Sequence, residues 1–309
     1  MARQYLSIDV GGTAVKSARI DHSGNIIVKR RTATPHDQTA FLHLLTEIVD
    51  RQPGVAAICV SVPGIVNPAT GAVKFTGALA FMGNFPLAAY LRQYAGLPVY
   101  VGNDANCATL AELWLGNLTD VQNGAVITLG TSVGGGLVIN GQLVHGPHFR
   151  AGELSAIVNN YDHADPHQAT VGASTSAVKM IMAVAQACNL PDLKDGQRAF
   201  EEINKREGPA WEIFTAFCRR VAVLLINVQA VVDLDRIVIG GGISVQPILI
   251  SEVRHQFRLL QEGDRRLRDD IEMPTIVAAR FGNGANLLGA LYGLLLKIEE
   301  EELHACSSN

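Results

Sequence analysis

Short runs of apolar residues alternate with longer stretches in which apolar residues recur every three or four positions. The short runs predict strands, and the three-to-four spacing predicts amphipathic helices. In the first third of the chain the expected strands are residues 5–10, 14–20, 25–32, 55–62 and 99–102, and the expected helices are residues 39–51, 87–94 and 108–115. Strands and helices in this order indicate an α/β domain.

A similar order begins again after a polar stretch at residues 117–123. Two apolar strands flank a glycine-rich bend at residues 130–136, just as two apolar strands flank Gly11 and Gly12. The expected elements are strands 124–129, 137–139, 142–145, 235–239 and 277–280, and helices 174–188, 199–207, 209–232, 246–262 and 286–302. This internal repeat predicts two similar domains facing each other across a cleft, residues 1–116 plus 285–309 and residues 117–284.

Composition is consistent with two globular domains. The chain has 309 residues, of which 48% are hydrophobic, enough to bury a substantial core. Its formal net charge is -4 and its basic residues are scattered, so nucleic acid is not favoured as a partner. The amino terminus lacks a secretory signal, and the apolar tract around residues 287–296 is too short to span a bilayer. We therefore expect a cytoplasmic protein with no membrane partner and with five free cysteine thiols.

Asn103, Asp104 and Asn106 follow directly after the strand expected at residues 99–102. Ligands of open α/β sheets bind outside the carboxyl ends of the strands, so Asp104 is a candidate general base for a substrate hydroxyl. The alternative is that one of these polar residues only caps the helix that follows. This segment alone favours capping over catalysis.

The first glycine bend is a candidate phosphate site. Gly11 and Gly12 allow backbone N–H groups to approach a phosphate, while Thr13 offers a hydroxyl and Lys16 a positive charge. The segment is not a P-loop, because Val15 stands where glycine must precede the lysine and a strand follows instead of a helix. A glycine hairpin that binds nothing explains the pattern equally well.

Two later segments are weaker candidates. Gly240, Gly241 and Gly242 end a buried strand, where glycines let the planar face or the phosphate of a ligand lie against the backbone. His163 and His167 are four residues apart, but a proline between them argues against a shared helix face and no cysteine is near. We do not expect a metal site at these histidines.

Six short motifs occur in a specific order along residues 5–295. They are Asp9-Val-Gly-Gly-Thr13, Val62-Pro-Gly64, Gly102-Asn-Asp-Ala-Asn106, Leu129-Gly-Thr-Ser-Val-Gly-Gly135, Ala151-Gly-Glu153 and Ile239-Gly-Gly-Gly242. Each motif is weak singly, but together they resemble the signature of the ROK (repressor, ORF, kinase) sugar kinases. That family belongs to the actin-like, ribonuclease-H-like ATPase superfamily, whose α/β fold is the one we expect here.

The resemblance implies transfer of a phosphoryl group from ATP to a sugar hydroxyl, normally the 6-hydroxyl of a hexose. It makes Asp104 the catalytic base and assigns sugar binding to Gly64, Asn103, Asp104 and Glu153. Asp9 would hold Mg²⁺, through water. The remaining nucleotide-binding residues would be Gly11, Gly12, Thr13, Lys16, Gly130, Thr131, Gly134, Gly241 and Gly242. The family also suggests a homodimer.

Departures from the family pattern concern zinc. Most ROK kinases carry Gly-His two residues after the glutamate, whereas Leu-Ser-Ala follows Glu153 here. Residues 170–179, expected to carry a cysteine cluster and a final glutamate, contain no cysteine and end in Lys179. We therefore expect no structural zinc. Because the missing histidine and glutamate reach the sugar's anomeric end in the relatives, the pocket is less committed to a free 1-hydroxyl.

Three further segments are similar to the zinc-free β-glucoside kinases of the family. They are Thr76-Gly-Ala78, Asn84-Phe85 and Phe149-Arg-Ala-Gly-Glu153. The expected substrate is therefore a glucoside such as cellobiose, phosphorylated at the 6-hydroxyl of its non-reducing glucose. A kinase for glucose, fructose or N-acetylmannosamine stays open. A ROK repressor is disfavoured because the first strand starts almost at the first residue, and a sugar-binding pseudokinase because Asp9 and Asp104 are kept.

Overall fold

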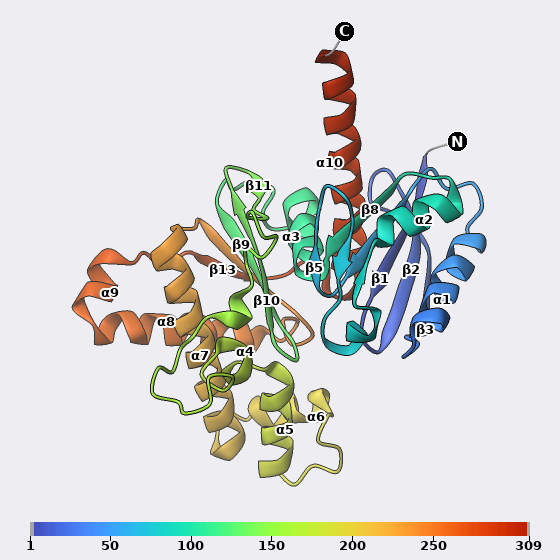
Figure 1. Ribbon diagram of the computed structural model, residues 1–309. Coiled ribbons are helices and arrows are strands. Elements are labelled where there is room, and N and C mark those ends of the chain that lie inside the picture. The colour runs from blue at the N-terminus through green and yellow to red at the C-terminus, as the bar shows by residue number, and fades with distance from the viewer. Residues whose placement is uncertain (1–2, 308–309) are drawn as a thin grey trace. The chain divides into compact units, whose positions relative to one another are not determined.

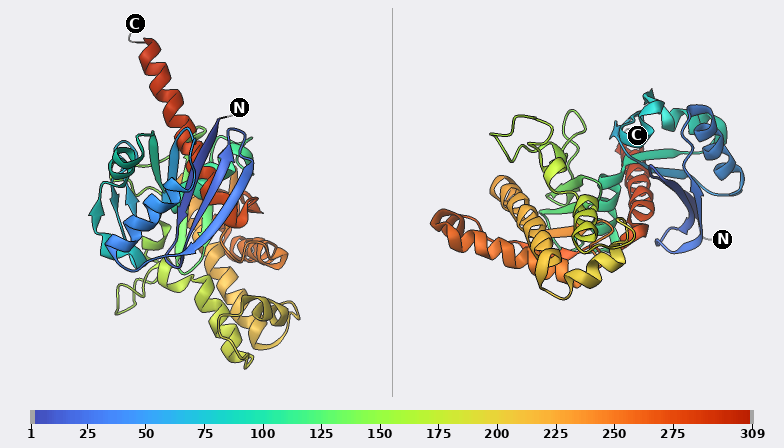
Figure 2. Two further views of the ribbon diagram at one scale, coloured as in Figure 1. Left: turned by 90° about the vertical axis from the view of Figure 1, so that its right-hand side faces the viewer. Right: turned by 90° about the horizontal axis from the view of Figure 1, so that it is seen from below.

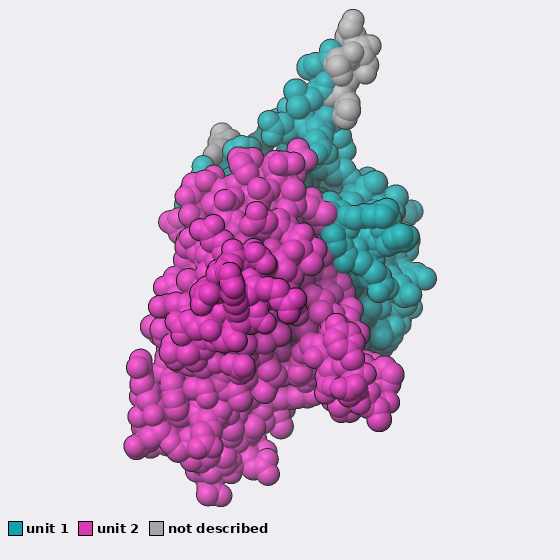
Figure 3. All heavy atoms as spheres, turned by 90° about the vertical axis from the view of Figure 1, so that its left-hand side faces the viewer, with its two compact units in different colours: residues 1–115, 145–151, 284–309 teal, residues 116–144, 152–283 magenta. Residues whose placement is uncertain are grey.

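The computed structural model describes residues 3–307, apart from the side chains of residues 304 and 307. The chain forms two compact units, which Figure 3 colours separately. Unit 1 comprises residues 1–115, 145–151 and 284–309, and unit 2 comprises residues 116–144 and 152–283. The division expected from the sequence had residues 145–151 in the second domain, whereas they group with unit 1.

Unit 1 is built on a five-stranded sheet with the strand order β3-β2-β1-β4-β8 (Figure 1). An antiparallel meander is followed by two parallel strands. The strands are β1 (Gln4–Val10), β2 (Ala14–Asp21), β3 (Ile26–Ala33), β4 (Ile58–Val62) and β8 (Val99–Asn103). A second, three-stranded sheet consists of β5 (Ile65–Val66), β6 (Val73–Lys74) and β7 (Asn84–Phe85).

Different helices cover the two faces of the five-stranded sheet (Figure 2). Leu6, Ile8 and Val10 of β1 pack with α1 (Gln38–Asp50), α2 (Leu87–Ala95) and the 3₁₀ helix η1 (Gly77–Met82). The opposite face meets α10 (Ala285–Ser307), which itself packs on α3 (Asp104–Leu115). There the Ser7 hydroxyl donates a hydrogen bond to the Leu287 carbonyl at 2.7 Å. Because side chains alternate along a strand, β1 presents an apolar face to α1 and turns Ser7 and Asp9 toward α10.

Two glycines let α10 approach its neighbours closely. A Cβ on Gly289 would overlap the backbone of Cys107 in α3, and a Cβ on Gly293 would overlap the ring of Tyr100 in β8. Residues four apart lie on one face of a helix, so the two glycines form one contact surface. On the same pair of helices Trp114 and Tyr292 stack with ring centroids 5.3 Å apart. The last helix is therefore an integral part of unit 1.

Unit 2 repeats the strand order of unit 1. Its sheet has the order β11-β10-β9-β12-β13, again an antiparallel meander followed by two parallel strands. The strands are β9 (Gly124–Leu129), β10 (Val133–Ile139), β11 (Gln142–Leu143), β12 (Arg236–Gly240) and β13 (Thr275–Ala278). The internal repeat predicted from the two glycine bends is confirmed.

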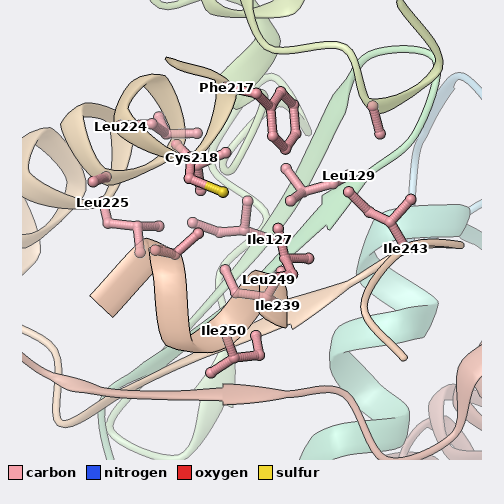
Figure 4. Close-up of a cluster of buried hydrophobic side chains, with 14 of the residues drawn as sticks. Ile127, Leu129, Phe217, Cys218, Leu224, Leu225, Ile239, Ile243, Leu249 and Ile250 are labelled. Atoms are coloured by element: carbon pink, nitrogen blue, oxygen red, sulfur yellow. The ribbon is translucent and has the colours of Figure 1, made fainter. Parts of the chain in front are cut away.

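Helices of unit 2 pack on its sheet around one hydrophobic core. Figure 4 shows Ile127 and Leu129 of β9 and Ile239 of β12 among side chains such as Phe217 and Leu249 from two of the helices. The helices are α4 (Val171–Ser174), α5 (Ala177–Ala187), α6 (Gly196–Ile203), α7 (Gly208–Val232), α8 (Pro247–Gly263) and α9 (Arg265–Asp270), with the 3₁₀ turns η2 (Leu154–Ala156) and η3 (Gly282–Gly284). By length and composition α7 could cross a membrane, but half of its most apolar window is buried inside the protein.

Two expected elements have different limits. The glycine bend expected at residues 130–136 is shorter, because Gly134, Gly135 and Gly136 belong to strand β10. At Gly135 a Cβ would lie 2.6 Å from the Leu154 side chain, so a glycine is needed for packing rather than for a bend. The helix expected from residue 108 begins at residue 104, which places Asp104 inside the first turn of α3.

Candidate active site

Asp104 stands at the carboxyl end of β8, as the first residue of α3. Its half-buried carboxylate accepts hydrogen bonds at Oδ1 from the Ala105 N–H group and from Asn103 Nδ2, both at 2.9 Å. Burial raises the pKa of Asp104 to about 6, and the negative charge of Asp9 also raises it, whereas these hydrogen bonds lower it. The carboxylate is therefore ionised at neutral pH yet much more basic than an exposed aspartate.

Asn103 caps the amino-terminal end of α3, a role that the sequence did not assign to one particular polar residue. Its Oδ1 accepts a hydrogen bond from the Asn106 N–H group at 3.1 Å, which satisfies a free donor in the first turn of α3. Its Nδ2 donates to Asp104 and, at 3.0 Å, to the carbonyl of Gly64. Gly64 has a φ of 120°, and a Cβ there would overlap the Lys74 carbonyl, so this position requires glycine. Capping thus falls to Asn103, and the Asp104 carboxylate is held in place beside it.

Asp9, at the end of β1, is buried and hydrogen bonded on both oxygens. Its Oδ2 accepts from Lys16 Nζ at 3.0 Å, and its Oδ1 accepts from Asn286 Nδ2 at 2.9 Å. Lys16 was expected at a phosphate, but in the structure its ammonium group pairs with Asp9. The sequence did not single out Asn286, whose signal is a polar side chain in the first turn of an apolar helix, shortly after Gly282 and Gly284.

Replacing Lys16 with methionine is expected to lower the free energy of unfolding by about 1–2 kcal/mol. The substitution leaves the buried Asp9 carboxylate without its cation, and the loss stays below that of a fully buried pair because the Lys16 side chain is 27% exposed. Urea unfolding measures the change. Lys29→Met, on the exposed edge strand β3, is the matched control and should have almost no effect. Equal stability of both variants would show that the ion pair contributes nothing.

The first glycine bend is a tight turn. The Gly11 N–H group donates to the Ala14 carbonyl at 3.0 Å, and the Thr34 hydroxyl donates to the Gly11 carbonyl at 2.6 Å. A Cβ on Gly12 would lie 2.8 Å from the Ala78 methyl group, and Thr13 is exposed. The turn thus uses the first N–H group internally and holds Thr13 at the surface.

The corresponding bend of unit 2 is similar. The Gly130 N–H group donates to the Ser132 carbonyl at 2.9 Å, and the Gly130 carbonyl accepts from the Ala177 N–H group at 2.9 Å, at the start of α5. Thr131, between Gly130 and Ser132, is exposed. Gly134 lies in β10 opposite Thr128. Gly134 is therefore a strand residue, and its contact with a phosphate stays a prediction.

Three other expected site residues belong to unit 2: Gly241 and Gly242 directly follow a strand, and Glu153 directly precedes the turn η2. Gly241 follows β12 with a φ of 96°, and a Cβ there would overlap the Leu129 carbonyl. Space is open around the position of a Cβ on Gly242. Glu153 is exposed and accepts a hydrogen bond from the Ser155 hydroxyl. Within residues 3–307 the structure groups no three His, Cys, Asp or Glu side chains in a way that could hold a metal ion.

Comparisons with known proteins identify the family. The ROK family profile matches residues 5–297. This chain belongs to the ROK family. A β-glucoside kinase of Listeria monocytogenes is 34% identical over 96% of this chain and 98% of its own length. A glucokinase of Halalkalibacterium halodurans is 27% identical, with 97% of each chain covered.

Solved ROK structures confirm the expected fold. A ROK family protein from Streptococcus pneumoniae, in complex with sucrose, superposes with a TM-score of 0.85 at 29% identity, covering 96% of this chain and 99% of that one. The actin-like ATPase fold, inferred from motif order, is therefore correct. In this ROK chain unit 1 contains both aspartates, the capping asparagine and the first glycine bend, and the charge of Asp9 acts on the Asp104 carboxylate.

Proposed function

We propose that this protein is an ATP-dependent kinase that phosphorylates the 6-hydroxyl of a glucoside such as cellobiose. The observation that carries the proposal is the Asp104 carboxylate, fixed by two hydrogen bonds and with its pKa raised to about 6. ROK membership and 34% identity to a β-glucoside kinase support the reaction and the substrate class. The sucrose complex of the Streptococcus pneumoniae protein supports a site that accepts a disaccharide.

Asp104 acts as the general base in this reaction. It accepts the proton of the sugar hydroxyl as that oxygen forms a bond to the terminal phosphorus of ATP. The bond from this phosphorus to the oxygen that bridges it to ADP breaks, ADP leaves with that bonding pair, and the proton stays on the carboxylate. The hydrogen bonds from Asn103 and Ala105 fix the direction of the carboxylate. The Gly64 carbonyl fixes Asn103 in turn, so three backbone or side-chain contacts position one catalytic group.

Asp9 is the residue that would hold Mg²⁺. In nucleotide sites this ion is commonly held by one or two carboxylates together with substrate phosphates, and a carboxylate has about four acceptor positions, of which Lys16 and Asn286 use two. The Asp9 carboxylate therefore keeps acceptor positions that fit a bound Mg²⁺ ion. When bound, Mg²⁺ would neutralise charge on the phosphates of ATP. Asn286 and Lys16 orient the Asp9 carboxylate.

The glycine bends would hold the phosphates through backbone N–H groups. In unit 1, Gly12 and Thr13 follow the N–H group that the turn itself uses, so their N–H groups and the Thr13 hydroxyl are the donors we assign. In unit 2 we assign Thr131 beside Gly130 on the same basis. Nucleotide contacts of Gly134, Gly241 and Gly242, and the sugar contact of Glu153, rest on the family resemblance.

Activity is expected to fall with acidity below about pH 6. The raised pKa means that Asp104 gains its proton on passing downward through about 6, and a protonated carboxyl group cannot accept another proton. Below that pH, kcat/KM should drop about tenfold per pH unit. A pH–rate profile measured with saturating ATP gives the result, and a flat profile down to pH 5 would contradict the assignment of the base.

A substrate panel tests the function. A coupled assay with Mg-ATP should show turnover of cellobiose and gentiobiose that exceeds turnover of glucose, fructose and N-acetylmannosamine. The glucokinase relative makes a monosaccharide kinase the second candidate. Turnover confined to a monosaccharide would replace the glucoside with that candidate, and no turnover of any sugar would refute kinase activity towards this panel.

A further inference from the structure

One row of residues crosses the sheet of unit 1 near the carboxyl end of β1. It consists of Lys16 in β2, Asp9 in β1, Ser61 in β4 and Gly102 in β8, each paired in register with the next. Paired residues of neighbouring strands point to the same face of a sheet. The Asp9 side chain therefore has Lys16 on one flank and Ser61 on the other.

Ser61 is the unusual member of this row. Its side chain is fully buried, and among the described residues its Oγ is the buried side-chain oxygen or nitrogen that has no hydrogen-bond partner. Ser7, two residues before Asp9 on the same face, instead donates its hydroxyl to the Leu287 carbonyl. A buried hydroxyl without a partner is unfavourable, because it has lost its hydrogen bonds to water. The sheet thus keeps a hydroxyl beside Asp9 that this arrangement does not use.

The polar groups around Ser61 show which partner it could reach. Burial raises the pKa of the Cys107 thiol well above its ordinary value, the Ser61 hydroxyl lowers it, and the charges of Asp104 and Asp9 raise it. The Ser61 hydroxyl therefore lies beside this thiol and near both carboxylates. A thiol sulfur is a weak acceptor, whereas a carboxylate has about four acceptor positions, of which Asp9 uses two. Asp9 is the neighbour in the row that can use the hydroxyl best.

Lys16 is the member of the row that is free to move. Its side chain is 27% exposed, whereas that of Asp9 is 7% exposed. A lysine ammonium group is a compact charge on a flexible stem, and lysine commonly binds phosphates. Departure of this group would remove a donor from the Asp9 carboxylate. The Ser61 hydroxyl, on the other flank, can replace that donor by rotation about its own Cα–Cβ bond.

We propose that Ser61 is a positioning residue, which donates its hydroxyl to the Asp9 carboxylate when the Lys16 ammonium group turns to a phosphate of ATP. The turn of Lys16 to a phosphate rests on the proposed function. The exchange of donors does not, because any loss of Lys16 from Asp9 brings the Ser61 hydroxyl into use. One donor or the other then holds the carboxylate in both arrangements.

A double-mutant cycle in the absence of nucleotide tests the exchange of donors. Ser61→Ala alone should leave the urea midpoint unchanged or raise it, since it removes a buried hydroxyl that has no partner. In the Lys16→Met background, where Ser61 is expected to donate to Asp9, the same substitution should raise the equilibrium constant of unfolding about tenfold. An equal effect of Ser61→Ala in both backgrounds would overturn the proposal.

Ser7→Ala is the matched control for the cycle. The Ser7 hydroxyl already donates to the Leu287 carbonyl, so its removal should lower the urea midpoint by the same amount with and without Lys16. Coupling to Lys16 that is as large for Ser7 as for Ser61 would mean that the cycle reports general damage to the sheet, which would also overturn the proposal.

Calorimetric titration with Mg-ATP tests the role of Ser61 beside a nucleotide. Ser61→Ala should bind Mg-ATP about tenfold more weakly than the unaltered protein, because it removes a hydrogen bond to a charged group that forms only in the complex. Ser7→Ala should bind it equally well. Unchanged affinity in Ser61→Ala would refute this role. An unaltered protein that binds no Mg-ATP would contradict the proposed function instead, while the cycle would still decide the exchange of donors.

Discussion

Asp104→Asn is expected to lower kcat by about 10²–10⁴-fold while leaving the dissociation constant of the sugar within about threefold. Asparagine keeps the size of the side chain and an oxygen that can accept from Ala105 and Asn103, but it cannot take a proton from the substrate. Steady-state kinetics and sugar binding in the absence of ATP measure the two effects separately. Activity within tenfold of the unaltered protein would remove Asp104 from its role as the base.

The same variant should be more stable near neutral pH. The pKa of Asp104 is raised from 3.8 to about 6, so folding favours its protonated form, and the stability that this provides is lost as the pH rises through 6. At pH 7 the ionised carboxylate therefore destabilises the fold by up to about 3 kcal/mol, and a neutral asparagine avoids that cost. The gain should shrink as the pH falls and vanish near pH 4.

Asp162→Asn is the control for both measurements. It removes one carboxylate from an exposed loop of unit 2 that contains none of the expected site residues, and it should change neither kcat nor stability. Unfolding of the three proteins in urea at pH 4 and pH 7 gives the comparison. A pH-independent difference between Asp104→Asn and the unaltered protein would mean that the raised pKa is not its cause.

Gly289→Ala is expected to destabilise unit 1 by at least about 3 kcal/mol. The added Cβ would overlap the backbone of Cys107, and neither the carbonyl group of α3 nor the backbone of α10 can move without disturbing the sheet contacts of both. The fluorescence of Trp114, which stacks on Tyr292, reports the loss of this contact during urea unfolding. The transition should shift to lower urea.

Gly284→Ala is the matched substitution, because a Cβ there meets nothing within 4 Å. It lies one residue before α10 and should leave the Trp114 transition almost unchanged. If both variants unfold at the same urea concentration, the close approach of α10 to α3 is not what stabilises unit 1.

The local sequence pattern was sufficient to predict the role of a residue when that role depends on its neighbours in the sequence. The apolar run before Asn103 predicts a strand, and polar side chains directly after it indicate both a helix cap and a candidate base. The structure contains the cap, at Asn103, and holds Asp104 beside it. The repeat of strand, glycine bend and strand likewise predicts two similar sheets, and both have the same strand order.

The sequence pattern did not predict the role of a residue when that role depends on a contact with a residue far away in the sequence. Asn286 donates a hydrogen bond to Asp9, although the two residues are 277 positions apart in the sequence. No local sequence pattern around either residue indicates this contact. The run of glycines predicts that Gly135 lies in a bend, yet it lies in β10, where a Cβ would overlap the Leu154 side chain. The strands β5, β6 and β7 have two residues each, too few to show any alternation.

Unit 1 is made from both ends of the chain, and this has a consequence for the order of synthesis. Ser7 and Asp9 are synthesised 280 and 277 residues before their respective partners Leu287 and Asn286. Until then the face of the sheet of unit 1 that contacts α10 lacks that helix. Unit 2 ends at residue 283, before α10 exists, so we expect it to fold first on the ribosome. A nascent chain halted before residue 285 should keep unit 1 open to proteases and chaperones.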